Sequence, residues 1–416
     1  MFESIPQSIY QIDATDPMGL TKLFDFPFMK VARIEGNKDK GCLILFCEQE
    51  HPFAICPTCK SISSSIHDYK RRTVRHLPCN GQACYIEFLA RRFYCDMCRC
   101  SFREELEWVD RCHRLTASYR IFLFTQCQQT TIQAVSRKER IGYKTVEYLY
   151  YEFAAEATRN RSLGLVKKLG IDEIALTKGH DNFVLVLSDL EKGRIIAVLP
   201  DRKKETLEAY FATWTQEQRD AVEDAAMDLW EPYAQAAKKC LPKARIVADR
   251  FHVMKNLNDQ VTSARREIQR GLPEESKSIF KNCRWLLVRN AEDLSDKDKS
   301  KLEAMFTVSP ALKQLHTLKE DFRSIFEKEH SLEEAGTQLE AWIKSVEESK
   351  LTKLSKFIGT LRNRWKDILN YFHERLTSGK VEGLNNKIKV IKRCAYGFVN
   401  FDHFSLRVLV ECGGTT

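Results

Sequence analysis

Three acidic residues, Asp172, Asp228 and Glu382, stand at positions where a metal-dependent enzyme would need them. Asp172 ends an apolar stretch typical of a strand, Asp228 lies near the end of another, and Glu382 falls on a predicted helix far downstream. Carboxylate oxygens suit Mg²⁺ or Mn²⁺, and two such ions can activate an attacking oxygen and stabilise a leaving oxygen at a phosphodiester. Brought together, these residues would perform phosphoryl transfer.

Each acid alone has a simpler explanation. An Asp at a strand end is usually a solvated cap or turn residue, and a Glu on a basic helix is usually half of a surface ion pair. Taken singly, each position favours that explanation. The catalytic interpretation therefore depends on a fold that joins the three.

The segments around the two aspartates predict such a fold. Strands are expected at 165–176, 183–189, 194–200, 223–232 and 244–253, and helices at 203–222 and 233–241. This order of strands and helices is that of the RNase H-like fold, in which the first and fourth strands are neighbours at the centre of the sheet. Asp172 and Asp228 would then lie side by side.

The third acid lies on a predicted helix at 377–393 that mixes one acid with several bases. Glu382, either Asn385 or Asn386, Lys389 and Arg393 share one face of this helix. We assign Asn386 and Lys389 an accessory role at the site. Lys392 and Arg393 are candidate DNA contacts.

Two CxxC pairs, Cys56–Cys59 and Cys95–Cys98, have the spacing with which thiolates grasp a tetrahedral zinc ion. A closed four-thiolate shell leaves no open position, so this zinc would be structural. Buried free cysteines are the alternative. The strand-like segments between the pairs carry four candidate phosphate contacts, namely Arg71, Arg72, Arg91 and Arg92.

Three short helices are predicted at 117–127, 130–138 and 143–157. Their lengths, and the glycine that separates the second from the third (Gly142), are typical of a helix-turn-helix whose last helix enters the major groove of DNA. An ordinary linker bundle fits the pattern equally well, but the neighbouring cysteine pairs favour DNA binding. Arg137, Lys138 and Lys144 are the candidate phosphate contacts.

Composition is consistent with a DNA-binding protein of several domains. The chain has 416 residues and a formal net charge of +9, and 43% of its residues are hydrophobic. No apolar segment approaches membrane-spanning length, and the first residues lack an export signal. Fifteen cysteines without such a signal indicate a reducing cytoplasm.

The sequence from 253 to 375 is predicted to be almost entirely charged, amphipathic helix. We therefore expect a multidomain α+β protein with a zinc ribbon, a helix-turn-helix, an RNase H-like domain and a long helical segment before the helix that carries Glu382. The predicted divisions are an N-terminal segment at 1–50, the zinc ribbon at 51–112, the helix-turn-helix at 113–160, the first part of the catalytic core at 161–255, the insertion at 256–375 and the last part of the core at 376–416.

Four ordered stretches resemble the bacterial insertion-sequence transposases of the L-three group. They are CPTC with RRFYCDMC, then GIDE, then MDLWEPYAQAAKKCLPKARIVADRFHV, and finally SGKVEGLNNKIKVIKRCAYGF. The resemblance runs nearly from end to end, and it implies an α/β RNase H-like domain interrupted by an all-helical insertion before the catalytic Glu. It implies a DDE enzyme that acts on terminal inverted repeats and target DNA in a bacterial cytoplasm, as a homodimer or higher multimer, with two Mg²⁺ or Mn²⁺ ions in each active site.

The resemblance leaves two assignments open. Asp249 also ends a strand and competes with Asp228 as the second catalytic acid; we prefer Asp228, and Asp249 with His252 resembles an Asp-x-x-His element of related transposases. His252 either orients a ligand or is a satisfied core residue. Trp285 resembles an insertion tryptophan that stacks on a base, although a buried packing position is the favoured alternative.

Three functions are compatible with these features. The first is a transposase that cleaves and joins DNA strands. The second is a zinc-dependent DNA-binding regulator without catalysis, and the third is a structure-selective nuclease on the same fold. Three acids at positions that one fold can join disfavour the regulator, and the end-to-end resemblance disfavours the nuclease.

Overall fold

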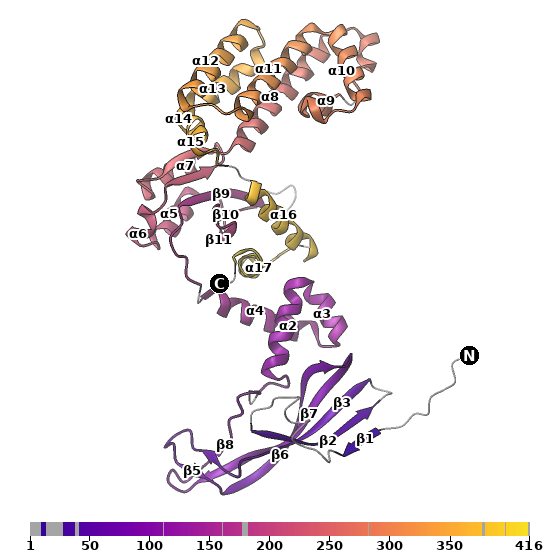
Figure 1. The fold of residues 1–416 in the computed structure, drawn as a ribbon, viewed down its shortest axis with the longest axis vertical. Helices are drawn as coiled ribbons and strands as arrows, with labels where there is room; N and C mark the ends of the chain where they lie inside the picture. Colours follow the sequence, from indigo (N-terminus) through magenta and orange to yellow (C-terminus); the bar gives the residue numbers. More distant parts are fainter. Residues whose placement is uncertain are drawn as a thin grey trace, which may run out of the picture. The chain divides into compact units, whose positions relative to one another are not determined.

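The computed structural model describes residues 10–13, 28–37, 41–110, 112–159, 161–176, 182–281, 283–376, 379–395 and 397–414. The chain divides into two compact units, Met1–Glu156 and Ala157–Thr416. The first contains a sheet followed by three helices, and the second contains another sheet with many helices (Figure 1).

The first unit is built on a six-stranded sheet of order β1-β2-β3-β7-β6, with β8 paired to β7. Its strands are β1 (Tyr10–Asp13), β2 (Met29–Asn37), β3 (Cys42–Gln49), β6 (Ile66–Cys79), β7 (Gln82–Cys95) and β8 (Cys100–Arg103). Two short strands, β4 (Ala54–Ile55) and β5 (Ile62–Ser63), pair separately. Because β3 pairs with β7, Cys42–Gln49 belongs to the same sheet as the strand that ends at Cys95.

Three helices follow the sheet, as the sequence predicts. They are α2 (Ala117–Gln129), α3 (Ile132–Glu139) and α4 (Tyr143–Arg159). Thr116 and Thr131 cap α2 and α3 by accepting backbone hydrogen bonds. The buried carboxylate of Glu139 ties the helices to the sheet, because it accepts from the Tyr119 hydroxyl at 2.8 Å and pairs with Arg75 of β6 at 3.4 Å.

The second unit contains a five-stranded sheet of order β11-β10-β9-β12-β13. Its strands are β9 (Lys168–Ala175), β10 (Phe183–Asp189), β11 (Arg194–Leu199), β12 (Asp224–Met227) and β13 (Arg245–Ala248). β12 runs parallel to β9, and Met227 lies opposite Ile171. The predicted adjacency of the first and fourth strands is confirmed.

Helices cover both faces of this sheet. Leu169 and Ile171 of β9 pack toward α5 (Lys204–Ala212) and α7 (Glu231–Cys240). The side chain of Ile174 points to the other face of the sheet and packs toward α16 (Gly379–Cys394) and α17 (Phe401–Cys412). A short helix, α6 (Gln216–Asp220), precedes β12.

The described residues between 250 and 374 form helices and no strand. The elements are α8 (Arg250–Arg270), η1 (Glu274–Ser278), α9 (Arg284–Val288), η2 (Ala291–Asp293), α10 (Asp296–Val308), α11 (Pro310–Glu327), α12 (Leu332–Glu348), η3 (Thr352–Leu354), α13 (Ser355–Asn363), α14 (Trp365–Leu369) and α15 (Tyr371–Glu374). Their core includes Val247 and Ala248 of β13, so the insertion packs directly on the sheet. Within the described part of the chain, we find no helix that combines the length and the apolar character needed to span a bilayer.

Gly170, two residues before Asp172, stands where β9 and β10 approach each other closely. A Cβ at Gly170 would lie 2.5 Å from the Ser188 Oγ and 2.7 Å from a Leu190 methyl carbon. Both neighbours are buried, so a side chain at this position would push β9 away from β10.

We expect Gly170→Ala to lower the free energy of unfolding by about 1–3 kcal/mol through overpacking, measured by thermal unfolding of the full chain. Gly359→Ala is the matched control, because its added Cβ meets open space within α13 and should stabilise that helix by up to about 1 kcal/mol. Equal unfolding midpoints for the two variants would contradict this account of Gly170.

Candidate functional site

Asp172 and Asp228 face the same side of the second sheet. Because Met227 lies opposite Ile171 and both pack toward α7, the next pair along the strands, Asp228 and Asp172, points to the opposite face. The His252 ring lies between the two carboxylates: its Nδ1 is 3.2 Å from Asp228 and its Nε2 is 3.7 Å from Asp172. Sequence-predicted residues from two strands and one helix therefore meet here.

A pocket of about 250 Å³ opens above Asp172. It is lined by residues of β9, of the start of α8 and of α16, namely Asp172, Glu173, Ile174, Asp249, Phe251, His252, Lys255, Glu382, Asn385 and Lys389. Asp228 is not among the lining residues and contacts the pocket through His252. Glu382 is exposed on the first turn of α16. Two of the three predicted acids thus line one pocket, and the third lies behind a lining residue.

Asp249 lies in the same pocket but has a local structural role. Its carboxylate caps α8 by accepting from the backbone N–H of Phe251 at 3.0 Å. Both candidates for the second acid are therefore close to Asp172, and only Asp228 follows the strand that pairs with β9.

The electrostatics of the site favour a bound cation. Burial alone would raise the pKa of Asp172, but hydrogen bonds from His252, the Glu173 backbone and Asn385 hold that pKa below its ordinary value. Burial would lower the pKa of His252, yet Asp172, Asp228 and Asp249 together raise it. The surroundings are thus negative enough to favour positive charge on a buried imidazole.

Asn385, rather than Asn386, contacts Asp172. The Asn385 side chain donates to the Asp172 carboxylate at 2.5 Å, whereas Asn386 is exposed on an open groove along α16. The helical spacing is compatible with either residue, and the side of α16 that faces β9 decides between them, because it carries Asn385. The accessory role expected for Asn386 has no support in this geometry.

The residues present fit a divalent metal by the chemistry of their donors. Carboxylate and amide oxygens surround the pocket, and the buried Oδ1 of Asn385 has no hydrogen-bond partner. The carboxylates are spread more widely than a closed metal shell: among the described residues, the four cysteines are the one group of three or more possible ligands whose atoms all lie within 4.8 Å of one another.

The basic residues of α16 divide into two kinds. Lys389 lines the acidic pocket and is exposed, and Arg393 is exposed on the adjoining groove. Lys392 donates to the backbone carbonyl of Ala175 at 2.6 Å, so its ammonium also holds α16 on β9.

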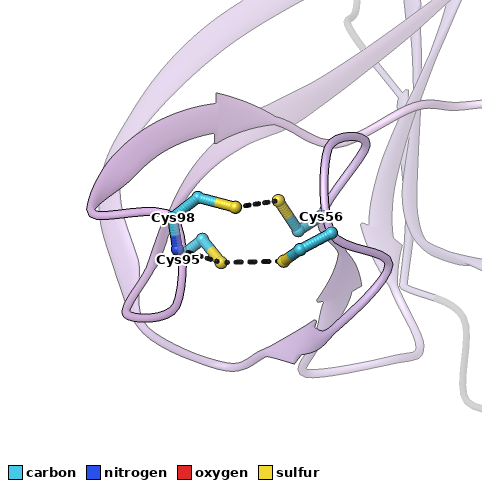
Figure 2. Close-up of side chains that lie close together, drawn as sticks. Cys56, Cys95 and Cys98 are labelled. Carbon is cyan, nitrogen blue, oxygen red and sulfur yellow. Dashed lines mark hydrogen bonds between the residues drawn. The ribbon is translucent and has the colours of Figure 1, made fainter.

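The four predicted cysteines of the first unit converge. The Cys56 and Cys98 sulfurs are 3.9 Å apart and the Cys59 and Cys95 sulfurs 3.5 Å apart, close to the roughly 3.8 Å expected around a tetrahedral zinc ion with zinc–sulfur bonds of about 2.3 Å. Figure 2 shows the sulfur atoms of Cys56, Cys95 and Cys98 facing a common centre. Hydrogen bonding from Ser61 lowers the pKa of Cys59 to about 6, which favours the thiolate that zinc binds.

The candidate DNA contacts of the helices are accessible. Arg137 and Lys138 are exposed on α3. Lys144 is exposed at the start of α4, where it pairs with Glu147 at 2.7 Å.

The four arginines of the sheet differ in exposure. The Arg71 side chain is 74% exposed beside Glu87, and Arg92 pairs with Asp68 on the surface. Arg72 donates to the backbone carbonyls of Asp110 and His113. Arg91 departs from the expected phosphate contact, because its guanidinium is buried and donates two hydrogen bonds to Oε2 of Glu104, while its backbone N–H donates to Oε1.

Sequence reasoning missed four residues of the pocket and misjudged one tryptophan. Glu173, Ile174, Phe251 and Lys255 line the pocket beside the predicted residues. Phe251 carried a weak signal, being an aromatic residue in the first turn of a helix, between Asp249 and His252. Trp285 is 59% exposed with the Arg284 guanidinium 5.1 Å from its ring, so the expectation of buried packing is wrong.

Zinc binding can be tested on the purified chain. We expect one zinc ion per chain by elemental analysis, lost in Cys59→Ser because one thiolate of the tetrahedral shell is removed. Cys100→Ser is the control, since Cys100 is exposed and outside the group. Full zinc content in Cys59→Ser would refute this ligand set.

The two kinds of arginine should respond differently to truncation. Arg91→Ala leaves the carboxylate of Glu104 buried without its partner, so we expect a loss of about 3–5 kcal/mol in the free energy of unfolding. Arg71→Ala should change stability by no more than about 0.5 kcal/mol. Thermal unfolding of both variants checks this, and similar effects would contradict the assignment of Arg91 to the core.

Comparison with known proteins agrees with this arrangement. Residues 169–408 match a family model described as a transposase, residues 52–98 match the zinc-finger of the IS204/IS1001/IS1096/IS1165 transposases, and residues 104–153 match the helix-turn-helix domain of transposase family ISL3. The chain is 26% identical over 384 residues to the transposase for insertion sequence element IS1001 of Bordetella parapertussis, covering 91% of this chain and 94% of that protein. It is also 26% identical over 301 residues to the transposase for insertion sequence element IS1557 of Mycobacterium tuberculosis, covering 67% of this chain and 66% of that protein. The zinc ribbon, the helix-turn-helix and the carboxylate-bearing sheet thus occur in the order of one family, and this chain belongs to the ISL3 family of insertion-sequence transposases.

Proposed function

We propose that this transposase binds the terminal inverted repeats of its element and performs metal-dependent strand cleavage and strand transfer with Asp172, Asp228 and Glu382. The observation that carries the proposal is the common face of Asp172 and Asp228, together with the pocket that Asp172 shares with Glu382. The proposed site can receive a phosphodiester because it is open, acidic at its base and bordered by Lys255 and Lys389.

The three carboxylates would hold Mg²⁺ or Mn²⁺, two ions per site, which supply activation of the attacking oxygen and charge stabilisation at the leaving oxygen. His252 separates Asp172 from Asp228 and holds both side chains in place by its two ring nitrogens. Asn385 fixes the Asp172 carboxylate from the side of α16. The ammonium groups of Lys255 and Lys389 border the pocket and would attract the phosphates of the strand being cut.

DNA recognition would lie mainly in the first unit. The exposed side chains of Arg137, Lys138 and Lys144 on the helix-turn-helix are placed to contact phosphates, while the zinc holds the ribbon from which Arg71 and Arg92 project. Arg393 of α16, with Lys392 beside it, adds basic surface near the catalytic pocket. We further propose that Trp285, which is exposed next to Arg284, stacks on a base of the bound DNA.

The proposal extends to the setting of the reaction. Because both ends of the element must be brought together before they are transferred to target DNA, we propose a homodimer or higher multimer on DNA. The proposed location is a bacterial cytoplasm. The predicted domain divisions stand as proposals, with the sheet of the first unit extended to include residues 28–49.

Removing each acid tests the chemistry. We expect Asp172→Ala, Asp228→Ala and Glu382→Ala to reduce Mg²⁺-dependent cleavage of the element's own ends by at least about a thousand-fold, since each removes a metal-binding carboxylate, while DNA affinity is retained. Asp249→Asn is the comparison variant, because an asparagine side-chain oxygen can still accept the hydrogen bond that caps α8, and it should keep most activity.

Three results of this experiment would contradict the proposal. Loss of activity in Asp249→Asn with full activity in Asp228→Ala would exchange the roles of these two aspartates. Wild-type protein that binds the ends but never cuts them would favour a regulator. Cutting of branched DNA without any joining would favour a nuclease.

A further inference from the structure

The first unit carries an exposed apolar surface beside its zinc-binding turn. Phe28 is 59% exposed, Phe53 39% and Ile55 59%, and all three line a pocket of about 510 Å³. Ile62, which pairs with Ile55 across β4 and β5, is 69% exposed and does not line the pocket. We call these four residues, together with the pocket, the ribbon face. An exposed apolar surface of this kind is typical of a protein–protein interface.

The aromatic part of the ribbon face is held in place by a third ring. The His51 ring contacts both phenylalanines, with its centroid 4.9 Å from the Phe28 ring and 5.4 Å from the Phe53 ring. The backbone N–H of Glu50 also donates to the Phe28 carbonyl at 2.9 Å. Because these contacts already restrict the two rings, a partner that docks on them costs little further side-chain entropy.

The zinc-binding turn supplies the rest of the ribbon face. Lys60 lies in this turn, directly after the ligand Cys59, and Ile55 and Ile62 flank the turn on β4 and β5. The backbone N–H of Lys60 donates to the Cys56 carbonyl at 2.9 Å. Zinc bound by the four cysteines would therefore fix Lys60 and both isoleucines beside the pocket.

The charges of the ribbon face indicate the kind of partner. Lys60, Glu105 and Glu107 are exposed and line the pocket. Within the described part of the chain, the side chains of these three residues form no ion pair. Two exposed carboxylates repel the phosphates of DNA, so the partner is a protein surface that offers cations to the glutamates and a carboxylate to the lysine.

A second copy of this chain meets that requirement. In a two-fold dimer, the same surface of both copies forms the interface, so each contact occurs twice. Lys60 of one copy can then face Glu105 and Glu107 of the other. Ile62 lies beside the pocket rather than in it, so it can enter the pocket of the other copy. The ribbon face is therefore complementary to itself in charge and in shape.

We propose that the ribbon face joins two copies of this chain in a two-fold dimer. Each Ile62 enters the pocket of the other copy, and each Lys60 pairs with Glu105 and Glu107 of the other copy. This inference rests on the multimer of the proposed function and names its interface.

Sedimentation equilibrium of the full-length, zinc-loaded protein without DNA measures this dimer. We expect wild type to show a concentration-dependent equilibrium between monomer and dimer. Ile62→Asp should weaken dimerisation at least about ten-fold, because it places a charge where the dimer buries an apolar side chain. Leu89→Asp is the matched control, since Leu89 is 46% exposed on β7 and lies outside the pocket, and it should leave dimerisation unchanged.

Charge reversal tests the pairing itself. Lys60→Glu should weaken the dimer about ten- to hundred-fold, and so should Glu105→Lys combined with Glu107→Lys, because like charges then face each other. A mixture of these two proteins should recover dimers, since every facing pair is again opposite in charge. A partner other than a second copy of this chain would give no such recovery.

Three results would overturn the dimer: wild type that is monomeric at every concentration, a dimer that none of these changes weakens, or a mixture that does not recover. Zinc content and circular dichroism show whether each variant is folded. If Ile62→Asp is not folded, the charge-reversal mixture decides.

Cleavage of the element's ends is measured separately, which keeps the two proposals apart. Cleavage by a protein whose assembly does not depend on the ribbon face would reject this interface and leave the proposed chemistry standing. A dimer that depends on the ribbon face, without any cleavage, would reject the proposed chemistry and leave the interface.

Discussion

The parallel pairing of β12 with β9 is the constraint on which the second unit depends. With Met227 opposite Ile171, the alternation of side chains along both strands sends the apolar pair to one face and the pair Asp172 and Asp228 to the other. A slip of one residue in this register would bury one carboxylate under α7 and face an apolar side chain into the pocket. The two strands position the two aspartates, while α16 supplies Glu382 and Asn385 and α8 supplies His252.

The insertion is anchored to the same strands. The Asn370 side chain donates to the Ile246 carbonyl of β13, and Arg245 binds both carboxylate oxygens of Asp224 while also contacting Glu374 of α15. These contacts join the C-terminal end of the helical insertion to the first residues of β12 and β13. The chain can therefore leave the sheet after β13 and return at α16 with Glu382 on the face that already carries the two aspartates.

Sequence alone predicts the parts of this structure that arise from local pattern. The alternation of apolar residues marks the five strands, and the CxxC spacing marks the zinc ligands. It fails where tertiary packing decides, as at Asn385 and Asn386, which are adjacent on one helix although only Asn385 lies on the side of α16 that faces β9. Arg91 and Arg71 are both basic residues on strands, and only the fold shows that Glu104 lies opposite one of them in the core. Trp285 is a residue for which the sequence favours buried packing, although the fold leaves it exposed.

The central proposal is that the acids of β9, of the end of β12 and of α16 bind divalent metal together, two of them from the pocket above Asp172 and Asp228 from beside it. Anomalous diffraction from crystals grown with Mn²⁺ would test it most directly, because the anomalous signal locates manganese ions and distinguishes them from the light atoms of the protein and solvent. The account predicts manganese bound by the carboxylates of Asp172, Asp228 and Glu382. Manganese bound by Asp249 in place of Asp228, or no manganese within coordination distance of Asp172, would contradict it.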